Sequence, residues 1–130
     1  MTTEEIVGRF FAAREEGDVS AVEQLLADDV TIWHNFTGRV QTKQENIDTF
    51  VMLNELGSFK YMVLERHVTG DSLAQRYEAE VVMKSGEVLN IPVAIFMTVR
   101  DGQVVRIHEY LDSTHVVPGA ADVSSNSATT

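Results

Sequence analysis

The stretch V-V-R-I-H-E-Y-L-D at residues 104–112 alternates apolar and polar side chains, as a half-buried β-strand does. Successive side chains of a strand point to opposite faces, so Val105, Ile107, Glu109 and Leu111 share one face. Glu109 therefore lies in an apolar row. A carboxylate there must be paired, hydrogen-bonded or protonated, because burying a bare charge is costly. Two interpretations of Glu109 remain open. It is a general acid or base in a pocket, or it is a member of a structural ion pair or lies at a solvent-exposed strand end.

The residues before this stretch also have the period of strands. Residues 59–68, 73–83 and 87–99 are rich in β-forming side chains, and short turn sequences containing glycine separate them. This pattern predicts a long antiparallel meander that ends with residues 103–112. Pro92 cannot donate a ladder hydrogen bond, so it indicates an edge position, a bulge or a bend in the third of these strands.

The first 57 residues have the signals of three helices and one strand. Each helix is expected to begin with a capping box: Thr2 with Glu5, Ser20 with Glu23, and Thr42 with Glu45. The first helix is expected to end at Gly17, the second at the acidic pair Asp28-Asp29, and the third at Gly57. Residues 30–35 alternate as a short strand, which places Ile32 and His34 on one face.

These elements predict an α+β fold, in which three N-terminal helices cover one face of a curved antiparallel sheet and leave a pocket in a cone. We expect one domain at residues 1–116 and a disordered tail at residues 117–130, which is small and polar. The other sheet face is expected to carry Tyr77, His108 and Tyr110. Such a face suits a subunit interface, so the sequence predicts a homodimer.

Composition argues against several classes of partner. The chain has 20 acidic and 10 basic residues, a formal net charge of −10, and no cluster of basic residues. Nucleic acid and anionic membranes are therefore poor partners. The start of the chain is acidic, and no apolar run approaches the roughly 18 residues that span a bilayer, so we expect a cytoplasmic protein.

No cofactor or metal is expected from the sequence. The chain has no cysteine, and its four histidines, His34, His67, His108 and His115, lack the short spacing of metal ligands. Neither a phosphate-binding glycine loop nor a G-x-S-x-G motif is present.

The order of elements and three strings resemble the nuclear-transport-factor-2-like superfamily, especially its SnoaL-like members. The strings lie at residues 17–35 (G-D-V-S-A-V-E-Q-L-L-A-D-D-V-T-I-W-H-N), 37–39 (T-G-R) and 101–112 (D-G-Q-V-V-R-I-H-E-Y-L-D). The resemblance covers residues 3–115. It implies a cone-shaped α+β barrel, usually a homodimer. It leaves the reaction open, because the family includes isomerases, cyclases, dehydratases, epoxide hydrolases and non-catalytic binding proteins.

In the ketosteroid isomerase branch, the general base lies at the end of the first strand, where this sequence has His34. Histidine suits that role because its ordinary pKa is close to neutral. The branch places oxyanion donors where this chain has Phe10 and apolar residues around Ala94 and Ile95. Each missing donor is expected to cost on the order of 3 kcal/mol of transition-state stabilisation, which argues against efficient ketosteroid isomerisation.

The limonene epoxide hydrolase branch gives a second set of positions. Its water-binding tyrosine and asparagine correspond here to Trp33 and Asn35, and its arginine and two acids correspond to Arg76, Glu78 and Glu109. The polarity of the pattern is kept, but several identities change, which puts the geometry that holds the water in question.

We therefore expect a small-molecule enzyme that uses acid-base chemistry without a cofactor in an apolar pocket, as an isomerase, cyclase, dehydratase or epoxide hydrolase. Its substrate would be a polyketide-, steroid- or terpenoid-like molecule. The alternative is a non-catalytic binding module for a small apolar ligand. The expected catalytic residues are Glu109, His34, Arg76 and Glu78. The expected substrate-binding residues are Trp33, Asn35, Phe10, Phe50 and Ile95. His34 and the pair Trp33 and Asn35 cannot all face inward from one regular strand.

Overall fold

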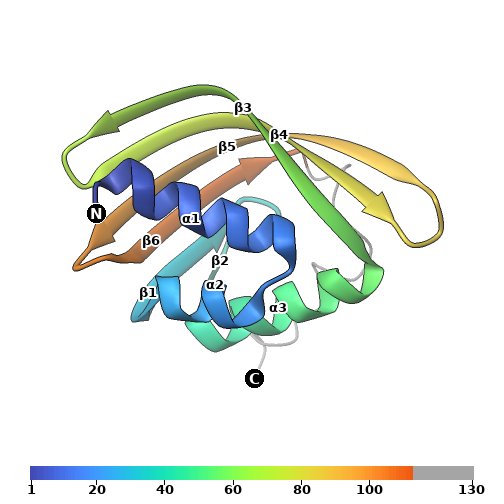
Figure 1. Cartoon of the computed structure of the whole chain (residues 1–130), viewed down its shortest axis with the longest axis horizontal. Coiled ribbons are helices and arrows are strands. Elements are labelled where there is room, and N and C mark those ends of the chain that lie inside the picture. The colour runs from blue at the N-terminus through green and yellow to red at the C-terminus, as the bar shows by residue number, and fades with distance from the viewer. Residues whose placement is uncertain (113–130) are drawn as a thin grey trace.

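The computed structural model describes residues 1–112, which form three helices packed on one side of a six-stranded sheet (Figure 1). The helices are α1 (Thr3–Glu16), α2 (Val19–Leu25) and α3 (Lys43–Leu56). The strands are β1 (Leu26–His34), β2 (Arg39–Gln41), β3 (Gly57–Thr69), β4 (Ser72–Met83), β5 (Val88–Arg100) and β6 (Gln103–Leu111). The expected α+β class is confirmed. The expected tail at residues 117–130 lies outside the described residues.

The helix ends follow the capping signals in two of three cases. Thr2 and Thr42 form the predicted capping boxes of α1 and α3, and Gly17 ends α1 in the left-handed conformation with φ 67°. The expected capping box at Ser20 is wrong. Asp18 caps α2 instead, because its carboxylate accepts the backbone N–H of Ala21, and α2 ends at Leu25 before the acidic pair.

Within residues 1–112 the sheet has the order β2-β1-β6-β5-β4-β3 and is not closed into a barrel. Strands β3 to β6 form the predicted antiparallel meander, whereas β1 runs parallel to β6. Among residues 1–112 the β5–β6 ladder begins at Val93, so within this part of the chain Pro92 lies where β5 has only β4 as a neighbour. A residue without a backbone N–H is tolerated at such a local edge.

Register shifts in the β1–β6, β3–β4 and β5–β6 ladders accompany the curvature of the sheet. The β3–β4 register shifts between Val63 and Glu65, which leaves one extra residue in β3. At the start of β3, a Cβ on Gly57 would collide with the Val82 carbonyl oxygen of β4, so this close approach requires glycine. The curved strands partly surround α1 (Figure 1).

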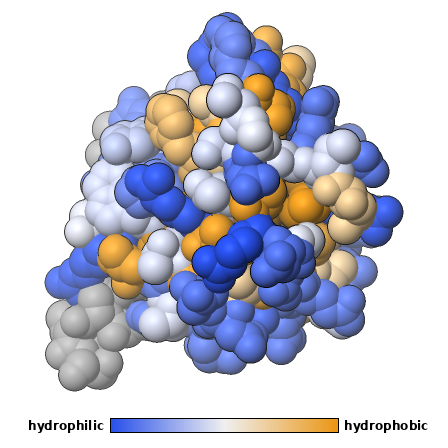
Figure 2. Space-filling view, turned by 90° about the vertical axis from the view of Figure 1, so that its left-hand side faces the viewer, coloured by the Kyte–Doolittle hydropathy of each residue, from blue (hydrophilic) through white to orange (hydrophobic). Residues whose placement is uncertain are grey.

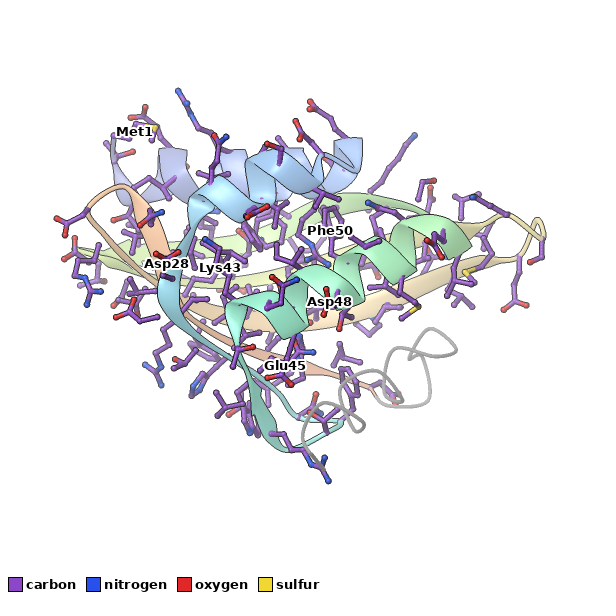
Figure 3. The ribbon with its side chains drawn as sticks, turned by 90° about the horizontal axis from the view of Figure 1, so that it is seen from below. Met1, Asp28, Lys43, Glu45, Asp48 and Phe50 are labelled. Atoms are coloured by element: carbon purple, nitrogen blue, oxygen red, sulfur yellow. The ribbon has the colours of Figure 1, made fainter. Side chains whose placement is uncertain are left out.

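The main hydrophobic core lies between the concave face of the sheet and the helices. Phe50 of α3 is fully buried and lies between α3 and α1 in Figure 3, whereas the ion pair of Lys43 with Asp28 lies near the surface. The surface in Figure 2 shows hydrophobic residues only as small groups among hydrophilic ones. Within residues 1–112, no helix is long and apolar enough to cross a membrane.

Candidate functional site

A pocket lies between the concave sheet face and the helices α1 and α3. Its apolar walls include Phe10 of α1, Phe50 of α3, Ile32 of β1, Ile95 of β5 and Ile107 of β6. The polar side chains that line it are Arg14, His34, Asn46, Thr49, Tyr61, Tyr77 and Glu109. A mostly apolar cavity with a few convergent polar groups is the usual form of a small-molecule site.

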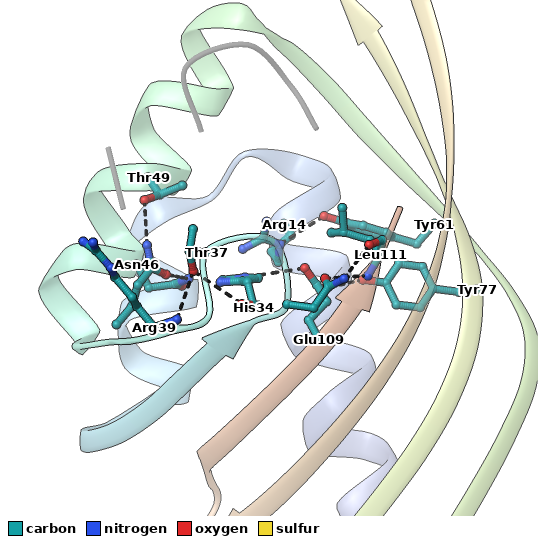
Figure 4. Close-up of polar contacts among 12 residues, drawn as sticks. Arg14, His34, Thr37, Arg39, Asn46, Thr49, Tyr61, Tyr77, Glu109 and Leu111 are labelled. Atoms are coloured by element: carbon teal, nitrogen blue, oxygen red, sulfur yellow. Dashed lines mark hydrogen bonds and ion pairs between the residues drawn. The ribbon is translucent and has the colours of Figure 1, made fainter. Parts of the chain in front are cut away.

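Glu109 is the centre of these polar contacts (Figure 4). Its Oε2 accepts a hydrogen bond from the Tyr77 hydroxyl at 2.9 Å, and its Oε1 lies 3.5 Å from Nε2 of His34. The side chains of His34 and Glu109 are 13% and 19% exposed, so the pair is largely shielded from water. Since β1 is parallel to β6 and His34 is in register with Glu109, the topology of the sheet brings the two residues together.

Burial and charge shift the pKa values around this carboxylate in definite directions. Burial lowers the pKa of His34, against the opposing attraction of Glu109. Burial and then the charge of Glu109 raise the pKa of Tyr77 well above its ordinary value. Near neutral pH, therefore, His34 favours its neutral form and Tyr77 remains a hydrogen-bond donor.

Arg14, in the last turn of α1, brings a positive charge to the same pocket. Its Nε–H donates to the Tyr61 hydroxyl at 3.0 Å, and its guanidinium carbon lies 4.9 Å from the centre of the Phe50 ring. Burial alone would lower the pKa of Arg14, but Tyr61, then Glu109 and Tyr77, act against burial and leave it raised. Arg14 is a permanent cation in a largely aromatic setting.

A second polar group lies at the α3 side of the pocket. Thr49 donates to the Glu45 carbonyl, and it accepts a hydrogen bond from Nε2 of Gln41. Gln41 Oε1 in turn accepts from Nδ2 of Asn46. This chain fixes the orientation of the Asn46 amide. Asn46 Oδ1 and His34 Nδ1 are both buried and have no hydrogen-bond partner among residues 1–112, so each could accept a ligand's donor group.

Comparison with known proteins agrees with this fold. The sequence model of the SnoaL-like domain matches residues 7–107 of the chain. The protein belongs to the SnoaL-like family. Among proteins with curated descriptions, none matches it.

Solved structures share the fold of this SnoaL-like protein at low sequence identity. An M. tuberculosis LEH-like epoxide hydrolase is 14% identical, with a TM-score of 0.77, over 98% of this chain and 95% of that one. IdmH from Streptomyces antibioticus, proposed to be a polyketide cyclase, is 18% identical, with a TM-score of 0.77, over 88% and 95%. A Catenulispora acidiphila protein with a ketosteroid isomerase-like fold, in complex with trimethylamine, is 19% identical, with a TM-score of 0.76, over 93% and 98%.

Five of the expected site residues of this SnoaL-like protein line the pocket. They are Glu109, His34, Phe10, Phe50 and Ile95. The alternation on β1 and β6 was sufficient to place His34 and Glu109, because both strands are regular at these residues.

Four other expected residues do not line the pocket. The expectation that Arg76 and Glu78 face it is wrong, because Tyr77 between them points inward and both point to the outer face of the sheet. Arg76 pairs there with Glu65 at 3.1 Å. Trp33 also lies on the outer face, and its ring centre is 5.1 Å from that of Tyr110.

Asn35 and Tyr77 are further corrections. Asn35 joins the ends of β1 and β6, since its side chain donates to the Leu111 carbonyl and accepts from the Leu111 N–H. Tyr77 was expected at a subunit interface, but it is 3% exposed and bound to Glu109.

Arg14 and Tyr61 were missed from the sequence, although a signal for each was present. Arg14 lies four residues after Phe10 and seven after Val7, so it continues the apolar stripe of α1. Tyr61 is two residues after Phe59, so the two share a strand face. A cation at the end of an apolar stripe could have indicated a charge at the pocket.

Among residues 1–112, no cluster of acidic or histidine side chains could hold a metal ion.

Proposed function

We propose that this SnoaL-like protein is an enzyme that uses acid-base chemistry, without a cofactor, on a small and mostly apolar oxygenated molecule. The observation that supports it most is Glu109, a carboxylate in an apolar pocket, held by the Tyr77 hydroxyl and facing His34 Nε2. A carboxylate and an imidazole in contact at a pocket wall are suited to proton transfer.

In this proposal Glu109 and His34 move the proton as a coupled pair, and Tyr77 holds Glu109 in position. The lowered pKa of His34 keeps its imidazole neutral near neutral pH, so the pair can take up one proton from a substrate. The apolar walls exclude water and so strengthen the electrostatic interactions at the pair.

The solved structures support the same general class. They include an LEH-like epoxide hydrolase and a proposed polyketide cyclase, two different reactions on one fold. A polyketide-, steroid- or terpenoid-like substrate fits a pocket with mostly apolar walls and a few polar groups.

Deuterium exchange at an activated carbon tests the proposal before the natural substrate is known. 2-Tetralone is an apolar ketone with acidic α-hydrogens, and NMR in deuterated buffer reports their replacement. We expect the wild-type protein to accelerate this exchange. Glu109→Gln keeps the size of the side chain but removes the proton acceptor, so exchange should slow by roughly 10²- to 10⁴-fold.

Glu78→Gln is the matched control, because the same change is made on the outer face of the same sheet. It should leave the exchange rate unchanged. The rival function is a binding module that uses the same pocket without turnover. That function would be favoured if 2-tetralone bound to the wild-type protein without accelerated exchange, or if Glu109→Gln exchanged as fast as wild type.

A further inference from the structure

We propose that the Arg14 guanidinium and the Tyr61 hydroxyl form the binding site for a carbonyl oxygen that becomes an enolate during the reaction. The inference rests on the proposed acid-base function and narrows its substrate class to carbonyl compounds with an enolisable α-carbon. It assigns a role to two pocket residues that the sequence analysis did not single out.

Arg14 has unused hydrogen-bonding capacity at the pocket. Its Nε–H is taken by Tyr61, but among residues 1–112 its two amino groups have no acceptor. Its guanidinium carbon lies 5.8, 4.9 and 6.0 Å from the ring centres of Phe10, Phe50 and Phe59. Aromatic faces attract a cation, but they do not accept its N–H groups as an oxygen does.

Tyr61 complements Arg14. Its oxygen accepts the Arg14 Nε–H, so its own hydroxyl proton is available, and it has no acceptor among residues 1–112. Its ring is fixed by the Phe11 ring at 5.1 Å and the Tyr77 ring at 5.6 Å. Burial raises the pKa of Tyr61, against the opposing charge of Arg14, so the hydroxyl remains a donor.

The other arginines with ion pairs in the described part of the chain are bound to carboxylates. Arg66 pairs with Glu4, Arg76 with Glu65, and Arg100 with Asp29. Arg14 has no carboxylate within ion-pair distance among residues 1–112, although Glu109 lines the same pocket. A cation left without an anion in an apolar cavity is costly unless a ligand oxygen completes its contacts.

Two neighbouring groups of the pocket divide the work of enolisation, namely Arg14 with Tyr61 and Glu109 with His34. Figure 4 draws Arg14 and Tyr61 to one side of the Glu109 and His34 pair. The pair removes a proton from the α-carbon, the C–H electrons form a carbon–carbon double bond, and the carbonyl π electrons move to oxygen. The oxygen becomes negative beside the Arg14 cation and the Tyr61 hydroxyl. Return of the proton to carbon restores the pair and the carbonyl, and no other reactant is consumed.

Binding of 4-nitrophenol tests the oxygen site separately from catalysis. Its phenolate resembles the enolate oxygen, and its absorbance distinguishes the ionised from the neutral form. We expect wild type to bind the phenolate, and to bind nitrobenzene, which has the same nitro group but no phenolate oxygen, more weakly. Arg14→Met keeps an apolar side chain of similar length and should weaken phenolate binding by roughly 10- to 100-fold, with nitrobenzene binding unchanged.

Two further variants keep the test informative if Arg14→Met is unstable. Tyr61→Phe keeps the ring and removes only the hydroxyl, so it should weaken phenolate binding several-fold. Glu109→Gln should strengthen it, because the opposing negative charge is lost. Arg76→Met is the matched control on the outer face and should bind as wild type does.

The oxygen site is overturned if wild type binds nitrobenzene as tightly as the phenolate. It is equally overturned if Arg14→Met and Tyr61→Phe both bind the phenolate as wild type does. Neither result depends on 2-tetralone exchange. Failure of the acid-base function would show in Glu109→Gln exchange rates, whereas failure of the oxygen site shows in phenolate affinity.

Discussion

The two faces of the sheet use the same residue types in opposite ways. On the inner face, Tyr77 is buried and donates to Glu109. One residue away, Arg76 points to the outer face and forms an exposed ion pair with Glu65. Tyr110 follows Glu109 directly, yet it is exposed beside the Trp33 ring. The direction of a side chain from the strand, more than its type, decides whether it can take part in the site.

Arginine shows the difference most clearly. Arg14 reaches the pocket from a helix and lies against aromatic rings, where its charge has few partners. Arg76 lies on a strand in water, where solvent weakens its attraction to Glu65. At an inner position the interactions of a charge are strong, and its burial costs free energy. At an outer position solvent weakens those interactions, so the charged residue can be replaced at little cost.

The largest expected effect comes from removing a phenylalanine ring on each side of the sheet, Phe50 of α3 on the inner side and Phe96 of β5 on the outer side. Phe50 is 0% exposed, and Phe96 on the outer face of β5 is 49% exposed. Phe50→Ala should lower the free energy of unfolding by about 3 to 5 kcal/mol, because it leaves a cavity in the core. Phe96→Ala should cost less than about 1 kcal/mol in the monomer. Urea unfolding followed by circular dichroism measures both, and equal losses would contradict the assignment of the faces.

Much of the fold could be predicted from local patterns. The capping boxes at Thr2 and Thr42 place α1 and α3 correctly, and the glycine turns give the antiparallel meander. The parallel pairing of β1 with β6 was not predicted, because it joins residues 26–34 to residues 104–109 and no local signal specifies so distant a contact. The Ser20 cap failed because Asp18, a comparably good N-cap residue, precedes it and caps α2.

The site was only partly predictable, for a related reason. Alternation places Glu109 and His34 inward, since both lie in regular strands whose core face is clear. Arg76 was paired with Glu109 through family positions alone, although its own strand directs it outward. Tyr61 approaches Arg14 across a sequence separation of 47 residues, so their contact depends on how α1 packs against β3. Periodicity within one element cannot predict such packing.

The second expected effect is self-association of the chain through the outer face of the sheet. We propose that two copies of the chain form a homodimer through the aromatic group of Trp33, Phe96, His108 and Tyr110. Their rings contact one another and remain partly exposed, as in an interface that is covered by a partner. Light scattering at micromolar concentration should give about 29 kDa, twice the 14.5 kDa of the chain.

Charge substitution sharpens this test of the outer face. Phe96→Glu should shift the protein to the monomer, because a charge at a covered apolar contact is expensive to bury. Val51→Glu introduces the same charge at an exposed position of α3, away from the sheet, and should leave the dimer intact. A wild-type protein that stays monomeric at high concentration would contradict the proposed interface.

The smallest expected effect is a pH dependence that arises from the inner face. Burial lowers the folded-state pKa of His34 below its ordinary value of 6.5. As the pH falls through 6.5 toward that lowered value, the unfolded chain binds more protons at this position than the folded chain does. The buried neutral form of His34 therefore contributes stability that is fully present above pH 6.5 and is lost as the pH falls toward the lowered pKa. We expect His34→Gln to have a shallower decline in the free energy of unfolding than wild type between about pH 6.5 and roughly pH 5.

His67→Gln is the control on an exposed histidine, with a side chain 71% exposed. It removes an exposed, solvent-screened ion pair with Glu65 and no buried imidazole, so it should change the decline of stability much less than His34→Gln does, which separates the setting of His34 from the loss of a histidine as such. The sign of the His34 effect also reports which interaction is stronger in the pocket. Burial favours the neutral imidazole, and the nearby Glu109 carboxylate favours the charged one. If His34→Gln instead made the decline steeper, attraction by Glu109 would outweigh burial, and His34 would be charged near neutral pH and unable to accept a proton there.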